Sequence, residues 1–118
     1  DLILTTGGTG FSSRDITPEA TLAVAERPAP GIAEAIRAAS MEITRRAMLS
    51  RAVSVIRGKT LIVNLPGSPK ACMESMDVFM DQLPRPVPAA RLCHGLRAQA
   101  GSAGRRQRQI RQNLITLH

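Results

Sequence analysis

The chain has 118 residues, of which 43% are hydrophobic, and its formal net charge is +7. This length favours a single domain, and the hydrophobic share is too high for an intrinsically disordered chain. No apolar run approaches the roughly 20 residues of a membrane-spanning helix, and no secretory signal is recognisable, so we expect a cytoplasmic protein without a membrane partner. Two cysteines are too few for a disulfide framework and fit a reducing compartment.

The positive charge lies at one end of the chain. Residues 1–84 carry nine basic and nine acidic side chains, whereas residues 85–118 carry seven arginines and no acid. We therefore expect a neutral folded body over residues 1–84 and a disordered, basic, Pro/Arg/Gly-rich tail over residues 85–118. These arginines could bind nucleic acid or acidic lipid, but no nucleic-acid-binding module accompanies them, and a solvated tail is the commoner explanation. Truncation after Pro84 is expected to cost little stability.

The first half of the chain is predicted to form a strand and two helices. Leu2–Thr6 is a short apolar, β-branched run that stops at two glycines, which is typical of a buried strand feeding a turn. A helix is predicted from Thr17, as its N-cap, to about Arg27, because proline and glutamate follow the threonine. Gly31–Ser40 has apolar residues at helical spacing and is predicted to be the second helix.

A hairpin and a third helix are predicted in the second half. Ala52–Arg57 and Thr60–Leu65 are β-prone runs separated by Gly58 and Lys59, the pattern of a tight hairpin. A helix with apolar residues at helical spacing begins after Pro66–Pro69. Strands that alternate with helices indicate an α/β layered fold.

The segment Gly7-Gly8-Thr9-Gly10, at the end of the first strand, has two interpretations. Glycines allow positive φ angles and let main-chain N–H groups approach an anion. With Asp15 on the same loop, the segment suits a nucleotide phosphate and its Mg²⁺, because Mg²⁺ favours one or two carboxylates plus phosphate oxygens. The alternative is a purely structural tight turn in which Asp15 caps a helix.

Pro66-Gly67-Ser68-Pro69 forms a second strand-to-helix loop, and the free N–H groups of the helix start could bind an anion. Ligands of open α/β sheets sit beyond the carboxyl ends of strands, where both loops would lie. Alone, this loop would be interpreted as a plain turn, but two loops at equivalent strand ends favour a pocket. Cys72 is interpreted as a core residue, and Cys93-His94 lacks a partner pair at zinc spacing, so no metal site is expected there.

Residues 4–21, which contain Gly7-Gly8-Thr9-Gly10 and Arg14-Asp15, closely resemble the signature of the molybdopterin adenylyltransferases, the family of bacterial MogA and MoaB-like proteins and of the gephyrin N-terminal domain. The resemblance covers about Asp1 to Leu83 and includes Met48–Arg51, Ile56–Lys59 and Asn64–Pro69. It implies the molybdenum cofactor biosynthesis protein fold, a three-layer α/β sandwich with a mostly parallel sheet, here incomplete and usually a homotrimer. It also implies transfer of AMP from Mg-ATP to the terminal phosphate of molybdopterin, with release of pyrophosphate, ahead of a downstream molybdenum insertase.

The resemblance also implies roles for individual residues. Residues that would bind nucleotide are Gly7, Gly8, Thr9, Gly10, Asn64, Pro66, Gly67 and Ser68. Asp15 would be a catalytic aspartate tied to Mg²⁺, and Ser50 would lie in the pterin-side loop. The family places a second catalytic aspartate upstream of the matched region, and the composition changes after Leu83 as at a fragment boundary or a reading-frame shift. We therefore expect little or no adenylyl transfer by these 118 residues alone; a non-catalytic molybdopterin-binding or gephyrin-like scaffold fragment is the alternative function.

Overall fold

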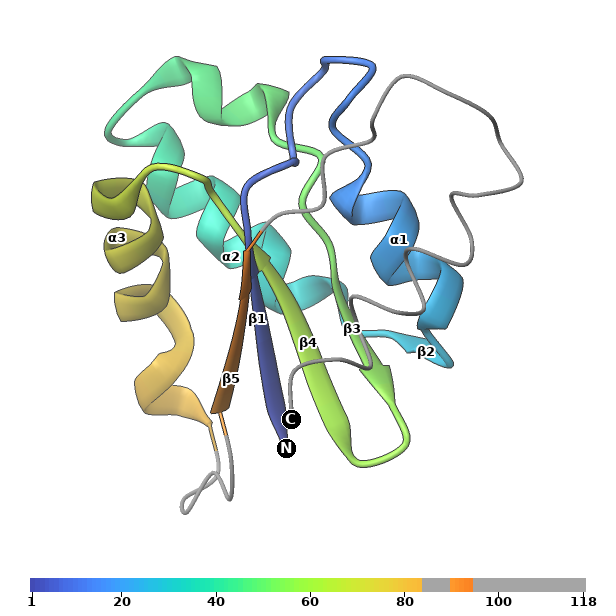
Figure 1. Ribbon diagram of the computed structural model, residues 1–118. Helices are drawn as coiled ribbons and strands as arrows, with labels where there is room; N and C mark the ends of the chain where they lie inside the picture. Colours follow the sequence, from blue (N-terminus) through green and yellow to red (C-terminus); the bar gives the residue numbers. More distant parts are fainter. Residues whose placement is uncertain (84–89, 95–118) are drawn as a thin grey trace.

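The computed structural model describes residues 1–83 and 90–94. Strands alternate with helices along these residues, and two 3-10 helices (η1 and η2) are added, in the order β1 (Leu2–Thr6), α1 (Thr17–Val24), β2 (Arg27–Pro28), α2 (Pro30–Met41), η1 (Arg45–Leu49), β3 (Ser54–Arg57), β4 (Thr60–Leu65), α3 (Pro69–Phe79), η2 (Met80–Gln82) and β5 (Ala90–His94). A twisted sheet forms the middle of the molecule, with helices around it (Figure 1). None of the helices in the described part combines the length and apolar character needed to cross a membrane.

The strands form one sheet in the order β2-β3-β4-β1-β5. It is parallel at its centre, where β1 lies between β4 and β5, and antiparallel from β2 to β4. The predicted hairpin is confirmed, since Arg57 pairs with Thr60 across a turn whose Gly58 has a φ of 56°. Thr6 and Leu65, the last residues of β1 and β4, are partners in the register. The loops that follow these two strands therefore leave the sheet at the same edge.

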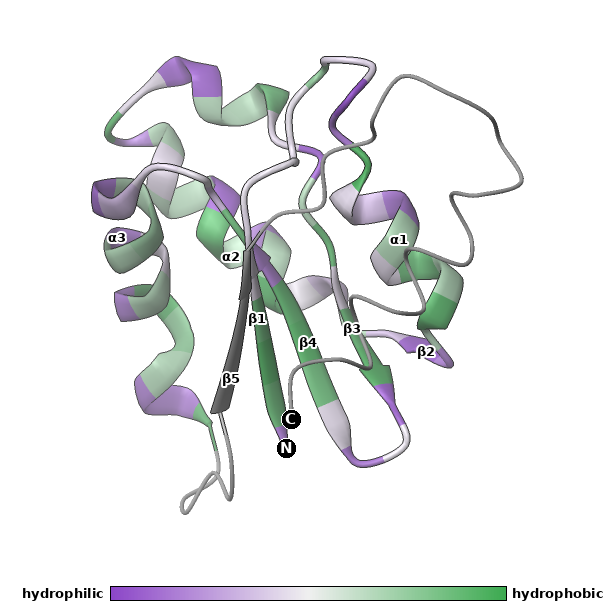
Figure 2. Ribbon diagram, in the orientation of Figure 1, coloured by the Kyte–Doolittle hydropathy of each residue, from purple (hydrophilic) through white to green (hydrophobic). Residues whose placement is uncertain are grey.

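The two faces of the sheet pack against different helices. On one face, side chains of β1 and β4 meet those of α2 and α3 in a buried core made up of Leu2, Leu4, Ile36, Val63, Leu65 and Phe79. On the other face, Asn64 of β4 donates a hydrogen bond to Thr21 of α1. These contacts give the three-layer α/β sandwich that the family resemblance implies, with the apolar strands at its centre (Figure 2).

The first helix is shorter than predicted. It begins at Thr17, with Ile16 rather than Thr17 at the N-cap, and ends at Val24 instead of Arg27. The chain is drawn into the sheet beyond it, because the N–H groups of Glu26 and Ala29 donate to carbonyls of β3. Sheet pairing at β2 thus outweighs the helical pattern of the sequence.

The expectation that regular structure ends near Pro84 is wrong, because a further strand, β5, follows it in the chain. Ala90–His94 pairs with all five residues of β1. The signal is weak in sequence because the strand is short and starts within a Pro- and Arg-rich stretch. The rest of the predicted disordered tail, residues 85–89 and 95–118, lies outside the described residues, as does Pro84.

Removing residues 85–118 should destabilise the protein, in contrast to the expectation from sequence. Without β5, one side of β1 loses its partner strand, and each lost hydrogen bond costs about 0.5–1.5 kcal/mol net. We expect a loss of about 2 kcal/mol, which is a fall of about 10 °C in Tm for a domain of this size. Thermal melts test this, with a chain ending at His94 as the control that keeps β5. Equal melting temperatures for the two truncated chains would contradict a stabilising β5.

Candidate functional site

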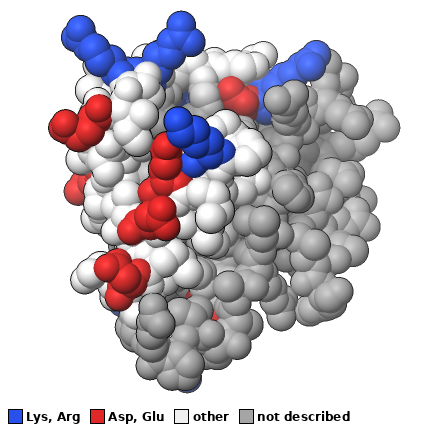
Figure 3. All heavy atoms as spheres, turned by 90° about the vertical axis from the view of Figure 1, so that its left-hand side faces the viewer, with Lys and Arg blue, Asp and Glu red and all other residues white. Residues whose placement is uncertain are grey.

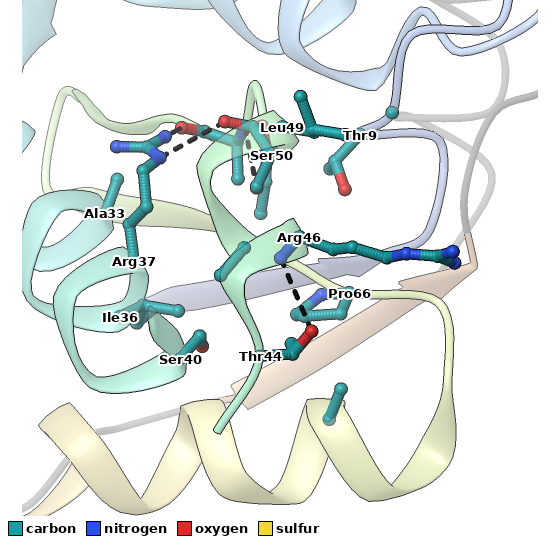
Figure 4. A pocket seen from close by; sticks show the side chains of 15 residues that line it. Thr9, Ala33, Ile36, Arg37, Ser40, Thr44, Arg46, Leu49, Ser50 and Pro66 are labelled. Carbon is teal, nitrogen blue, oxygen red and sulfur yellow. Dashed lines mark hydrogen bonds between the residues drawn. The ribbon is translucent and has the colours of Figure 1, made fainter. Parts of the chain in front are cut away.

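A cavity of about 310 Å³ lies at the edge of the sheet where β1 and β4 end. Its walls come from the loop after β1, from α2 and η1, from the segment before β3, and from the start of α3, as the close-up in Figure 4 shows. Of the predicted site residues, the cavity brings together Thr9, Gly10, Ser50, Asn64 and Pro66. The cavity therefore lies beside both predicted strand-to-helix loops, with Gly7, Gly8, Gly67 and Ser68 outside its lining.

The two loops approach each other closely at glycines. Gly7 has a φ of 80° and Gly8 a φ of 69°, conformations that side chains other than glycine rarely adopt. A Cβ on Gly67 would lie only 3.2 Å from the Cα of Gly7. The Gly7 N–H also donates to the Leu65 carbonyl, at 3.0 Å. These glycines allow the backbone of the first loop to lie close to the end of β4 and to the loop that follows it.

In the loop after β1, the carbonyl groups of residues 8–10 accept hydrogen bonds from the protein, whereas the amide groups of residues 8–11 donate none to the described residues. The carbonyls of Gly8, Thr9 and Gly10 accept hydrogen bonds from the Thr17 N–H, the Arg51 N–H and the Arg51 side chain, respectively. The N–H groups of Gly8, Thr9, Gly10 and Phe11 donate to no group within the described residues. A run of free amides beside a cavity presents partial positive charge, as anion-binding loops do.

Asp15 lies next to this loop without lining the cavity. Its Oδ2 accepts the Ser12 N–H at 3.1 Å and sits 2.8 Å from where a Cβ of Gly10 would be. The part of the chain that the structure describes contains no cluster of three or more metal-ligating side chains. A single carboxylate beside free amides fits a Mg²⁺ ion that takes its other ligands from phosphate and water. It would not fit a metal held by the protein alone.

Two side chains predicted to bind nucleotide make hydrogen bonds within the protein instead. The Asn64 amide, which is 1% exposed, donates to Thr5 at 2.8 Å and Thr21 at 2.9 Å and accepts the Val53 N–H. Both of its donors are used, so Asn64 shapes the cavity wall instead of offering a hydrogen bond to a ligand. Ser68 caps α3 by accepting the Ala71 N–H at 3.1 Å.

Arginines that the sequence did not single out surround the cavity. Arg37 lines it and donates to the carbonyls of Ser50 and Ala52, at 3.1 and 2.8 Å, which fixes the predicted pterin-side segment. Arg46 lines it too, and its side chain extends from η1 toward the Pro66 side (Figure 4). Basic side chains (blue) lie mainly at the top of the face in Figure 3, where the strands end, and acidic side chains (red) lie mostly below them. Among the described residues, the side chains that line the cavity include two cations and no anion.

Lys59 and Cys72, two further residues singled out by sequence, are not among the described residues that line this cavity. Lys59 occupies the hairpin turn, as predicted. Cys72 packs against the core, and burial raises the pKa of its thiol. The side chains of Cys93 and His94 are outside the described residues.

The family described as the probable molybdopterin binding domain matches residues 1–85 of the chain. A molybdopterin adenylyltransferase of Haemophilus influenzae is 53% identical over 81 residues, which are 69% of this chain and 41% of that protein. Gephyrin of Dictyostelium discoideum is 49% identical over 86 residues, 73% of this chain and 12% of that protein. The solved structure of the molybdopterin biosynthesis Mog protein from Mycobacterium ulcerans is 51% identical with a TM-score of 0.66, over 69% of this chain and 53% of that one. The chain thus spans less than half the length of either curated relative.

Proposed function

The chain belongs to the family of probable molybdopterin binding domains, and we propose from this that its cavity forms the nucleotide-phosphate part of a molybdopterin adenylyltransferase site. The observation that carries the proposal is the run of unbonded amides over residues 8–11 at the edge of the cavity. ATP and molybdopterin both carry phosphate, and main-chain N–H groups recognise phosphate without regard to the rest of the molecule.

In the proposed reaction, an oxygen of the molybdopterin phosphate attacks the α-phosphorus of ATP, and the bond to the β-phosphate breaks to release pyrophosphate. Such a transfer requires mainly positioning and neutralisation of charge, and no protein nucleophile. The free amides would hold the nucleotide phosphates, and Arg46 would add a positive charge at the cavity. Asp15 would hold Mg²⁺ together with phosphate oxygens, and Mg²⁺ supplies charge neutralisation when bound. Ser50, fixed by Arg37, would face the pterin.

Two ligands share the cavity in this proposal, so binding of each by the complete 118-residue chain tests it. Calorimetric titration should show Mg-ATP binding that weakens about tenfold or more in Asp15→Asn when Mg²⁺ is present, because the variant removes the carboxylate charge next to the cation. Without Mg²⁺ the two proteins should bind ATP equally. Unchanged binding of Mg-ATP by Asp15→Asn would contradict the metal role.

Pterin binding can be followed by the fluorescence of an oxidised pterin, because the chain contains no Trp and no Tyr that would emit beside it. Binding of pterin without any binding of Mg-ATP would reject the adenylyltransferase proposal in favour of the scaffold alternative, which the similarity to gephyrin supports. The homotrimer, the cytoplasmic location and the downstream molybdenum insertase stay predictions of the resemblance.

A further inference from the structure

Arg51 is bonded to the glycine loop through both its main chain and its side chain. Its N–H donates to the Thr9 carbonyl at 2.9 Å, and its Nε donates to the Gly10 carbonyl at 2.7 Å. Its Nη2 donates to the Asp15 carbonyl at 2.6 Å, and its Nη1 pairs with the Glu19 carboxylate. Every guanidinium nitrogen therefore has an acceptor within the protein, which distinguishes Arg51 from an arginine that is free to contact phosphate.

The carbonyl contacts determine where the loop amides point. In a planar trans peptide the C=O and N–H groups point in opposite directions. When Arg51 binds the Thr9 carbonyl, the Gly10 N–H of the same peptide must face away from Arg51. The contact with the Gly10 carbonyl orients the Phe11 N–H in the same manner. These are two of the four loop amides that have no acceptor in the described residues.

The position of Arg51 is itself fixed from both sides. Arg37 donates to the carbonyls of Ser50 and Ala52, the residues immediately before and after Arg51. On the far side, the hydrogen bond from Arg51 holds the pKa of the Glu19 carboxyl below its usual value, so the carboxylate keeps its charge to a lower pH than an unpaired glutamate does. Arg51 thus connects the segment that contains Ser50, on one wall of the cavity, to the glycine loop on another.

We propose that Arg51 is a positioning residue that presets the phosphate-binding conformation of the glycine loop by holding its carbonyls away from the ligand. The proposal rests on the proposed function in assigning phosphate as the ligand. The role requires the fork of the guanidinium, because its nitrogens reach the Gly10 carbonyl, the Asp15 carbonyl and Glu19 at once. A lysine ammonium keeps the charge but is a single point on a flexible stem. Arg51→Lys therefore separates loop geometry from charge.

The test compares Arg51→Lys with two matched variants of the complete chain. Arg57→Lys makes the same substitution at an arginine that donates to the Val24 carbonyl at 3.1 Å, away from the cavity. Glu19→Gln removes the negative charge but keeps a side-chain oxygen that can accept the Nη1 hydrogen bond, so Arg51 and its contacts with the loop carbonyls should stay in place. Titration with Mg-ATP should give an affinity at least about tenfold weaker for Arg51→Lys and within about twofold of wild type for both controls.

A second measurement follows the loop without ligand. The ¹H–¹⁵N resonance of Phe11 should shift in Arg51→Lys, because the Arg51 side chain binds the Gly10 carbonyl of the same peptide. The Thr9 carbonyl is bound by the main-chain N–H of residue 51, which lysine keeps, so the Gly10 resonance should shift less. The resonances of strand β4 should stay in place and show that the fold is retained. Millimolar guanidinium should restore part of the Mg-ATP affinity of Arg51→Ala, which a general loss of packing would not allow. An unshifted Phe11 amide, or wild-type affinity in Arg51→Lys, would overturn the proposal. If wild type itself fails to bind Mg-ATP, the proposed function fails, and the resonances still decide whether Arg51 sets the loop.

Discussion

Replacing Asn64 with alanine is expected to lower the free energy of unfolding by about 3–5 kcal/mol. The side chain lies at the centre of the sandwich and joins three elements by hydrogen bonds: β1 through Thr5, α1 through Thr21, and the segment before β3 through Val53. Alanine leaves the Val53 N–H and both hydroxyls without this partner and opens a void at a position that is 1% exposed. Unsatisfied buried polar groups cost about 1–3 kcal/mol each, so the losses accumulate.

Urea denaturation followed by circular dichroism measures this effect, with Thr5→Val as the matched control. That variant keeps the shape of the side chain and removes only one acceptor, so its cost should be about 1 kcal/mol. Below the unfolding transition, Asn64→Ala should still bind Mg-ATP within about threefold of wild type, because the amide has no free donor for a ligand. A large loss of affinity with normal stability would instead restore Asn64 as a nucleotide contact.

The elements nearest the cavity were predictable because their signals are local. Apolar runs of five or six residues next to glycines and prolines predicted β1 and β4 with their observed bounds, and Gly58-Lys59 predicted the hairpin. The position of the cavity followed from a general rule, since ligands of α/β sheets bind beyond the carboxyl ends of strands. The residue types at the end of β1 predicted a glycine loop there and left open whether it binds phosphate or is a structural turn.

The bonding partners of individual side chains were not predictable in the same way. Asn64 and its partner Thr5 are 59 positions apart, and Arg51 meets Gly10 across 41 positions. No spacing rule links residues so distant, because the fold alone brings them together. The strand β2 was missed for a related reason: its two residues pair only because β3 is already beside them. In each case tertiary context overrides local propensity.

The glycine loop itself can be tested by a single substitution, Gly8→Val, which should weaken binding of Mg-ATP by at least about thirtyfold. Gly8 has a φ of 69°, in the left-handed region that a β-branched residue avoids. A valine would shift the loop toward negative φ and rotate the peptide groups on both sides. The hydrogen bond of 3.1 Å from the Thr17 N–H to the Gly8 carbonyl would then break. The amides that follow Gly8 would no longer point toward one anion.

Gly58→Val provides the matched control for backbone strain. Gly58 also lies in the left-handed region, with a φ of 56°, and a Cβ there would meet nothing within 4 Å. Its turn joins β3 to β4 at the ends remote from the cavity, so the variant should lose stability comparable to Gly8→Val while its Mg-ATP affinity stays within about twofold of wild type. Thermal melts and calorimetric titration of both variants separate the two effects. If the loop after β1 contacts phosphate, strain at Gly8 must weaken Mg-ATP binding more than strain at Gly58 does. Equal affinities for Gly8→Val and Gly58→Val would therefore show that this loop is a structural turn.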